Sequence, residues 1–222
     1  MLKKSFKILA GLILLCFVCG FSDIKQKDDY TCAPVCAANC IINYNNFKAE
    51  NLVEYFSKEA KTTKKGTKTN NLCKALEKYF LQHKRTAYIK YYGIRGVDKR
   101  FKANKPLNIT DEISNGKSVI LNIGVYEKDG NLLKRKYGHY INAVTLDKNG
   151  KITVTDPYAK ESYSIELKDF QTTNLKIKHN KDDNERVCDR EYTYKEITDI
   201  PYLEKNETAL LNGVISVHLI YF

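Results

Sequence analysis

The chain has 222 residues, of which 43% are hydrophobic and 28% charged, so it is expected to fold as one domain of ordinary size rather than to stay disordered. Its formal net charge of +11 can attract nucleic acid, anionic lipid or an acidic wall polymer. However, the basic residues are scattered, and their densest patches, Lys61–Lys68 and Lys134–Lys136, are expected in solvated loops. No zinc-finger, RNA-binding or helix-turn-helix signature accompanies them, so we expect no nucleic-acid partner.

The N-terminus carries the pattern of a signal peptide. Three lysines occur in the first seven residues, and an apolar run of about fourteen residues then ends at Phe21. This run is too short to span a bilayer comfortably. We expect a signal peptide over 1–20, cleaved after Gly20, which leaves a charge of about +8 on the mature chain.

Export is therefore expected, to the periplasm, the extracellular space or the cell surface. The alternative to free secretion is a lipid anchor at Cys19 or Cys16, although the residues before either cysteine are bulkier than signal peptidase II usually accepts. No second hydrophobic stretch follows Phe21, so residues 21–222 are expected to be soluble and to contain no membrane span.

Helices are expected in the first half of the chain. Thr31 can cap a helix that runs from Cys32 to about Asn45, with Pro34 tolerated in its first turn. Two further stretches show apolar residues at helical spacing. They cover about Ala49–Ala60, and Thr69 or Asn70 through about Gln82.

The second half changes to the period of strands. The predicted strands are Thr86–Tyr92, Ser118–Tyr126, Tyr140–Leu146, Ile152–Asp156, Ser162–Leu167 and Val214–Tyr221. A short helix is predicted over Ile109–Asn115, and Asp129-Gly130 and Asn149-Gly150 mark turns. The polar segment Phe170–Leu203 gives no clear assignment. Helices followed by antiparallel strands predict an α+β fold.

Two of the seven cysteines lie in the leader, and export permits disulfides among the others. If Cys32 stays free, Cys36, Cys40, Cys73 and Cys188 allow three complete pairings, and the sequence does not choose among them. Helical positions four apart make poor disulfide geometry. Any bond is therefore expected to join the first helix to Cys73 or Cys188.

The segment from Gln26 to Cys32 can supply a nucleophile and an oxyanion hole. A thiol in the first turn of a helix feels the helix dipole and free backbone amides, and both favour the nucleophilic thiolate. The Gln26 amide can point at the oxygen that becomes negative during acyl transfer, together with the Cys32 backbone N–H. Taken alone, the segment fits a buried structural cysteine and a solvated glutamine as well. Cys36 is the competing nucleophile, but it lies one turn into the helix, where the amides are already bonded.

His139 is the best-placed of the four histidines to act as a general base. It follows a glycine and enters an apolar strand, whereas His83 lies at a helix end, His179 in a polar loop and His218 inside the terminal strand. A structural role is the alternative reading of a single histidine in such a place.

Asp156 ends an apolar strand and is followed by Pro157. The turn at Asn149-Gly150 folds this strand back beside the strand of His139, so antiparallel pairing is expected to place the two side chains nearly opposite each other. Asp156 can then accept from one ring nitrogen and orient the imidazole. The alternatives are an Asp that only caps a turn, and Asn142 as the orienting residue.

Together these residues resemble the C39 and C39-like peptidases of the papain superfamily. In that family a Gln lies six residues before the nucleophilic Cys, as Gln26 does before Cys32. A Gly-His-Tyr-like strand carries the base, as around His139, and an Asp-Pro after a hairpin carries the third member, as at Asp156. The pattern departs at Ala33, where Gly is usual, and no transporter domain is attached.

The resemblance implies a papain-like cysteine peptidase fold, with N-terminal helices packed on an antiparallel β-sheet, a core over about 26–167 and a C-terminal extension over about 168–222. It implies hydrolysis of peptide bonds in a peptide or protein substrate through a thioester, without cofactor or metal. The alternatives are a noncatalytic peptide-binding domain and an amidase or peptidase acting on peptidoglycan. A zinc site from Cys32, Cys36, Cys40 and a histidine lacks the usual paired knuckles.

Overall fold

The computed structural model describes residues 24–44, 51–171, 175–178, 186–187 and 192–220. The predicted signal peptide and the possible lipid-anchor residues Cys16 and Cys19 lie outside these residues, as do Cys188 and His179. Within the described part of the chain, no helix has the length and apolar character needed to cross a membrane.

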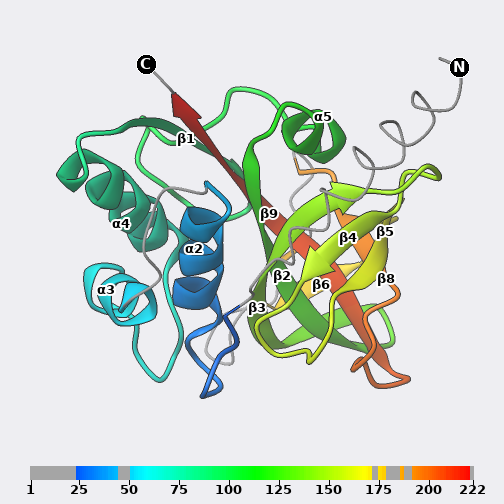
Figure 1. Ribbon diagram of the computed structural model, residues 1–222. Coiled ribbons are helices and arrows are strands. Elements are labelled where there is room, and N and C mark those ends of the chain that lie inside the picture. The colour runs from blue at the N-terminus through cyan, green and yellow to red at the C-terminus, as the bar shows by residue number, and fades with distance from the viewer. Residues whose placement is uncertain (1–23, 45–50, 172–174, 179–185, 188–191, 221–222) are drawn as a thin grey trace, which may run out of the picture.

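Three helices form one side of the molecule. They are α2 (Cys32–Ile42), α3 (Leu52–Glu59) and α4 (Thr69–Gln82), and a fourth, short helix, α5 (Ile109–Ser114), lies apart from them (Figure 1). The predicted bounds of α4 are confirmed, while α2 and α3 are shorter than predicted. Almost every residue of α2 is buried, which fits its central position between the other helices and the strands.

After α4 the described chain consists mainly of strands, with α5 in the long connection between β1 and β2. The strands are β1 (Thr86–Gly93), β2 (Ser118–Asp129), β3 (Leu132–Leu146), β4 (Ile152–Thr155), β5 (Tyr163–Asp169), β6 (Lys176–Lys178), β7 (Arg186–Val187), β8 (Lys195–Thr198) and β9 (Glu207–Ile220). The predicted α+β class is therefore observed, with helices first and a mainly antiparallel sheet second.

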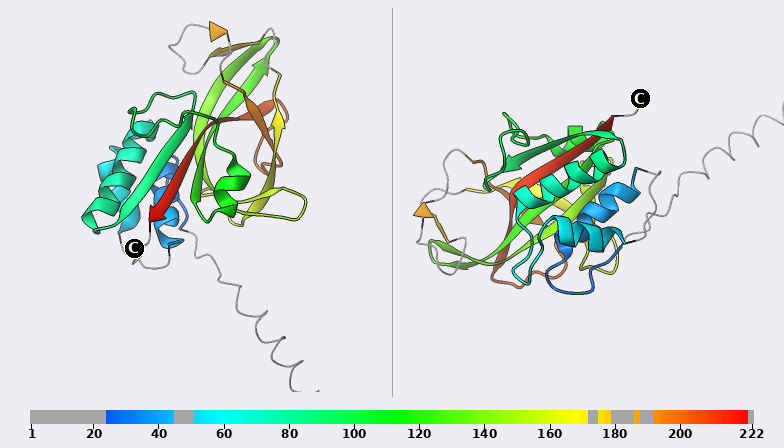
Figure 2. Two further views of the ribbon diagram at one scale, coloured as in Figure 1. Left: turned by 90° about the horizontal axis from the view of Figure 1, so that it is seen from above. Right: turned by 90° about the vertical axis from the view of Figure 1, so that its left-hand side faces the viewer.

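The sheet is a barrel rather than an open layer. Pairings of β2 with β3, β3 with β4, β4 with β5, β5 with β8, β8 with β9 and β9 with β2 return to their starting strand. The long strand β9 closes this ring, because one of its edges pairs with β2 while the other pairs first with β8 and then with β1. Figure 2 shows the helices on one side of β1 and β9 and the barrel on the other.

Two of the three buried hydrophobic clusters follow from the alternation of side chains along the strands. On β2, Val119, Leu121, Ile123 and Val125 belong to the core inside the barrel, whereas Ile120 packs with the helices. On β9, Ile215 and Val217 likewise face the helical core. The shared strands thus join the helices to the barrel as one folded unit.

Three predictions from the sequence were wrong in detail. Thr31 precedes α2, but its side chain makes no capping hydrogen bond, and Asp28 Oδ1 instead accepts from the backbone nitrogens of Tyr30 and Thr31. Strand β3 begins at Leu132 rather than Tyr140, so Lys134–Lys136 is part of a strand and not a loop. Strand β9 begins at Glu207 rather than Val214. In both strands pairing with β2 extends the strand beyond the predicted part. The added part of β9 is also largely buried, for example at Leu210 and Leu211.

Candidate active site

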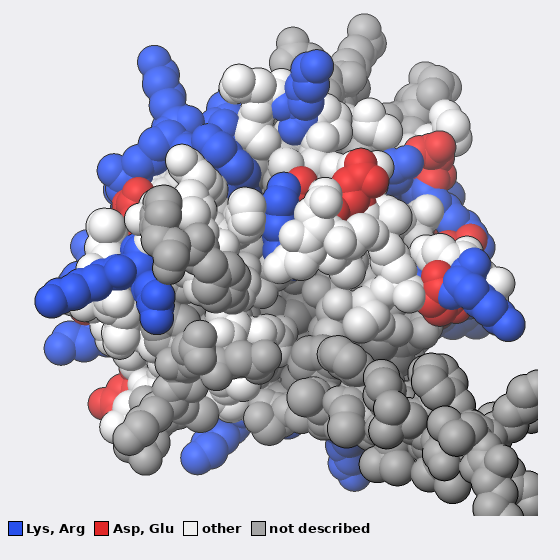
Figure 3. Space-filling model, turned by 45° about the horizontal axis from the view of Figure 1, so that its top comes forward, with Lys and Arg blue, Asp and Glu red and all other residues white. Residues whose placement is uncertain are grey.

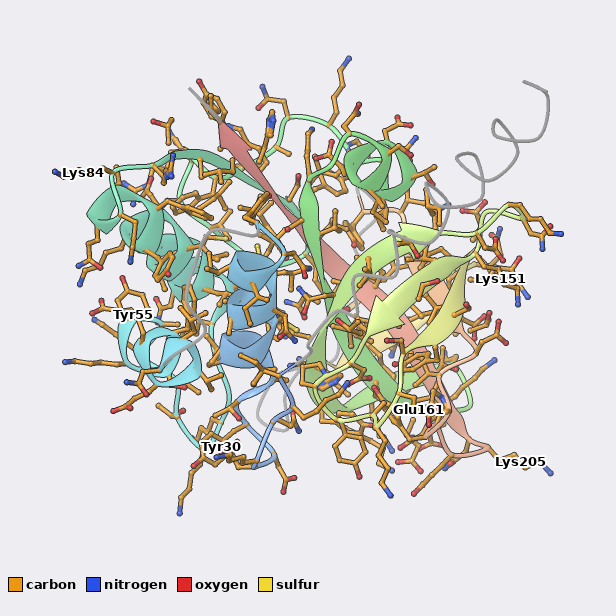
Figure 4. All side chains as sticks on the ribbon, viewed as in Figure 1. Tyr30, Tyr55, Lys84, Lys151, Glu161 and Lys205 are labelled. Atoms are coloured by element: carbon orange, nitrogen blue, oxygen red, sulfur yellow. The ribbon has the colours of Figure 1, made fainter. Side chains whose placement is uncertain are left out.

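Cys32 is the first residue of α2 and is almost completely buried. The preceding turn is fixed by Asp28, and the helix starts with the bond from Val35 N to Thr31 O, 3.0 Å long. Backbone N–H groups in the first turn of a helix have no partner within the helix, and the helix dipole is positive there. Cys32 thus lies at the end of the helix where backbone N–H donors are free. Tyr30, on the loop that leads into α2, is labelled in Figure 4.

His139 lies on β3, opposite Ile123 of β2, and is 8% exposed. Its Nε2 lies 2.6 Å from Asp156 Oδ1. Burial alone would lower the pKa of the imidazole, but contacts with Asp156 and with the Cys32 side chain outweigh it and raise the pKa to about 10. The ring is therefore held between a thiol and a carboxylate and stays protonated at neutral pH.

Asp156 follows directly after β4 and is 1% exposed. The hairpin brings it to His139 as the sequence suggested, although the paired residues at this end are Asn142 and Thr155, so the two side chains are offset along the strands. The irregularity in the register between Ala143 and Thr145 reduces this offset by one residue, because Val154 pairs with Ala143 rather than with Val144.

The Asp156 carboxylate accepts from four donors. Besides His139, the backbone N–H of Tyr158 donates to Oδ1 at 2.8 Å, and the hydroxyls of Tyr163 and Tyr202 donate to Oδ2 at 2.6 and 2.7 Å. Burial would raise the pKa of the carboxyl, but these partners, His139 above all, lower it to about 2. Asp156 is therefore ionised and its orientation is fixed on both oxygens.

Tyr163 and Tyr202 were not singled out in the sequence. Tyr163 opens β5, and Tyr202 lies in the polar C-terminal segment that gave no secondary-structure assignment. Tyr202 is 46 residues away from Asp156 along the chain, so no local sequence pattern indicates this contact. Only the closure of the barrel brings it to the carboxylate.

Gln26 lies on the extended segment before α2. Its backbone nitrogen donates to Pro157 O at 3.0 Å, and the neighbouring Lys25 Nζ donates to Asp156 O at 3.2 Å. This segment is thus tied to the turn that carries Asp156. Gln26 is partly exposed, but its Oε1 atom is buried without a hydrogen-bond partner, so the side chain is not fully solvated.

The other candidate side chains have structural settings. Cys36 is fully buried within α2, and Asn142 Nδ2 donates to Cys36 O at 3.0 Å, so this amide binds the helix rather than His139. Burial raises the pKa of Cys40 and of Cys73 to about 12. Among the described residues, no disulfide joins Cys73 to a cysteine of α2, so this one of the two expected pairings is not found. The other expected partner of the first helix, Cys188, lies outside the described residues.

A cleft of about 930 Å³ opens beside Cys32. One wall is the segment Lys64–Asn71 at the start of α4, and the other is Arg135–Gly138 with Tyr140 on β3. Tyr140 and Asn122 contact Thr69 through their polar groups and so join the two walls at the base of the cleft. Among the described residues, no three His, Cys, Asp or Glu side chains gather in a way that can hold a metal ion.

Comparisons with known proteins bear on the family of this chain. The sequence matches the model of the Peptidase_C39 like family over residues 19–181, which is more than half of the chain. A search of curated proteins found no match. Among solved structures, the peptidase domain of Streptococcus ComA, a bi-functional ABC transporter involved in quorum sensing, aligns with 18% identity and a TM-score of 0.38, covering 64% of this chain and 84% of that one.

Proposed function

This chain belongs to the Peptidase_C39 like family, and on that basis we propose that it is an exported cysteine peptidase that hydrolyses peptide bonds with Cys32, His139, Asp156 and Gln26. The observation that carries the proposal is the position of His139, whose ring contacts the Cys32 side chain on one side and the Asp156 carboxylate on the other. A buried structural histidine needs one partner, whereas a general base needs both a nucleophile and an orienting group.

In the proposed reaction the Cys32 thiolate attacks the carbonyl carbon of the scissile bond and forms a C–S bond. The carbonyl oxygen takes up the negative charge and accepts hydrogen bonds from the Cys32 backbone N–H and the Gln26 amide. When the C–N bond breaks, His139 gives its proton to the leaving amine. A water molecule then attacks the thioester, His139 takes its proton, and the acid product leaves Cys32.

The electrostatics of the site suit this sequence of steps. With His139 protonated up to a pKa of about 10 and Asp156 ionised down to about 2, the imidazolium is ready to donate as soon as the thiolate has attacked. Asp156 also fixes which ring nitrogen faces Cys32, since its Oδ1 engages Nε2.

We propose a papain-like fold as well, because the helices lie on one side of the molecule and the barrel on the other. The nucleophile comes from the helical side and the base and acid from the barrel, so the cleft lies at their junction. Export rests on the sequence of residues 1–20, and the mature protein is proposed to act outside the cytoplasm on a peptide or protein.

The test is intact-mass analysis of the purified mature protein after reaction with a thiol-reactive peptide-carbonyl probe. Fast addition of one probe molecule is expected in the parent protein, with no addition at this site in Cys32→Ala and much slower addition in His139→Ala. The same spectra give the mature N-terminus, which tests the cleavage after Gly20. Labelling at Cys32 that is indifferent to His139, or no labelling at all, contradicts the peptidase proposal and favours a noncatalytic binding domain.

A further inference from the structure

The cleft beside Cys32 is lined by side chains of predominantly positive charge. Its basic residues are Lys64, Lys65, Lys68, Arg95, Arg135 and Lys136, and its one acidic residue is Asp29. The face in Figure 3 shows Lys and Arg side chains spread around it with Asp and Glu among them. The strong excess of basic residues in the cleft contrasts with the mixed charge of that face.

Several basic residues outside the cleft have a carboxylate oxygen within 4.0 Å, among them Lys74, Lys78, Arg100 and Lys117. Within the cleft Lys136 has such partners, because its Nζ lies 2.6 Å from Glu207 and 3.4 Å from Glu204. Arg95 and Arg135 differ. Within the part of the chain that the structure describes, neither guanidinium has a carboxylate oxygen within 4.0 Å. Two arginines thus line one cavity without an acidic partner from the protein itself.

Arg135 is the better fixed of the two. Its Nε is buried and makes no hydrogen bond, and its guanidinium lies against Gly138, where an added Cβ atom would collide with Nη2. Gly138 directly precedes His139. The glycine therefore leaves room for the arginine in the cleft that Cys32 also lines, and a side chain at this position would displace it.

The electrostatic setting of Arg135 agrees with this geometry. Burial and the nearby charge of Arg95 lower the pKa of the Arg135 guanidinium, against opposite contributions from Tyr126 and Tyr140. Two partly desolvated positive groups that repel each other gain most from a bound anion between them. A guanidinium also binds a carboxylate through two parallel hydrogen bonds, which fixes the position of the ligand.

We propose that Arg135 and Arg95 form a carboxylate-binding subsite in the cleft, so that the preferred substrates are peptides with a carboxylate close to the scissile bond. This inference rests on the proposed peptidase function and names its substrate class. The carboxylate belongs either to an Asp or Glu side chain or to the free C-terminus of the substrate. The exposed Lys64, Lys65 and Lys68 add a weaker, salt-sensitive attraction at the mouth of the cleft.

The test uses fluorogenic peptides that differ at one position at a time, with Glu, Gln or Lys placed in turn on either side of the scissile bond. A second set carries a free or an amidated C-terminus. At the preferred position, Glu is expected to exceed Gln by about tenfold or more in kcat/KM, as one charge-assisted hydrogen-bonded contact provides. A gain in the free-acid set alone identifies a C-terminal carboxylate instead.

Variants assign the effect to the two arginines. Arg95→Gln and Arg135→Gln are expected to remove the preference for Glu over Gln, while Arg100→Gln, which changes an exposed arginine paired with Glu77 outside the cleft, keeps it. Because Arg135 packs against Gly138, the residue before His139, its variant can lose activity for structural reasons. Arg95→Glu avoids this difficulty, since it is expected to reverse the preference toward Lys-containing peptides, a gain that misfolding does not produce.

The outcomes separate this inference from the proposed function. Labelling of Cys32 by a neutral probe, with equal hydrolysis of the Glu, Gln and Lys peptides, overturns the carboxylate subsite and leaves the peptidase intact. Absence of labelling in the parent overturns the peptidase itself. A preference for Glu that persists unchanged in both arginine variants places the subsite elsewhere and also overturns the inference.

Discussion

The Tyr202 hydroxyl, from the C-terminal extension, donates a hydrogen bond of 2.7 Å to Oδ2 of Asp156, the carboxylate whose other oxygen engages His139. Tyr163 donates to the same oxygen at 2.6 Å, so Oδ2 is held by two hydroxyls while Oδ1 faces the imidazole. The last third of the chain therefore completes the barrel and also positions a residue of the candidate active site.

Replacing Tyr202 by Phe removes this hydrogen bond and little volume. We expect the rate of Cys32 labelling to fall by about threefold to tenfold, since a hydrogen bond to a charged group contributes on the order of 1.5–3 kcal/mol and Tyr163 retains part of it. The alkaline limit of the pH–rate profile should move down, because Asp156 then holds the His139 proton less strongly. Tyr88→Phe, at an exposed tyrosine of β1, is the matched control. An unchanged profile in Tyr202→Phe shows that the hydroxyl does not position Asp156.

Replacing Asp156 by Asn tests the charge that holds the imidazolium. Burial alone would lower the pKa of His139, and contacts with Asp156 and Cys32 raise it to about 10. Loss of the carboxylate charge should therefore shift the alkaline limit of labelling to lower pH, measured as rate against pH in the parent and in the variant. If the labelling rate falls at the same alkaline pH in both proteins, the charge of Asp156 does not control the protonation of His139.

The same pair makes stability depend on pH. The pKa of His139 is raised from 6.5 to about 10, so its contribution is complete below 6.5 and is lost as pH rises through about 10. The pKa of Asp156 is lowered from 3.8 to about 2, so its contribution is complete above 3.8 and is lost as pH falls through about 2. We expect the difference in Tm between the parent and Asp156→Asn to be largest between these limits and to shrink outside them. A difference in Tm that is the same inside and outside these limits contradicts this expectation.

Replacing Gln26 by Ala removes the proposed side-chain donor of the oxyanion hole. The loss should appear in kcat rather than in KM, by about 100-fold to 1000-fold, because the charge on the oxygen develops only during the reaction. Peptide hydrolysis by the purified variant measures it, and Gln82→Ala, at the far end of α4, is the control. A change confined to KM indicates that Gln26 binds substrate instead.

Closure of the barrel predicts a strong dependence of stability on its interior. Leu121 is fully buried inside the barrel on β2, so Leu121→Ala is expected to lower the free energy of unfolding by about 2–5 kcal/mol. Leu81, which is 67% exposed on α4, provides the matched control, and Leu81→Ala should change it by less than about 0.5 kcal/mol. Urea unfolding of both variants gives the comparison. If Leu121→Ala and Leu81→Ala lower the free energy of unfolding equally, the packing described for β2 is wrong.

Much of the local structure could be predicted from the sequence. The periodicity of α4, the start of α2 at Cys32 and the turn before Ile152 depend on residues close together in the chain, and they are found as expected. The hairpin at this turn also brings His139 and Asp156 near each other, because a short connection leaves few ways to pair its strands. The order of Gln26, Cys32, His139 and Asp156 along the chain is by itself enough to indicate the family.

Other features were decided only by the tertiary structure. The polar segment after Phe170 gave no clear pattern, yet its strand β8 and the extended β9 close the barrel by pairing with strands far away in the sequence. The contact of Tyr202 with Asp156 follows from that closure. Periodicity and turn residues report local preferences, whereas strand pairing and burial depend on partners that only the folded chain brings together, and this is why the sequence shows the reacting residues but not those that hold them.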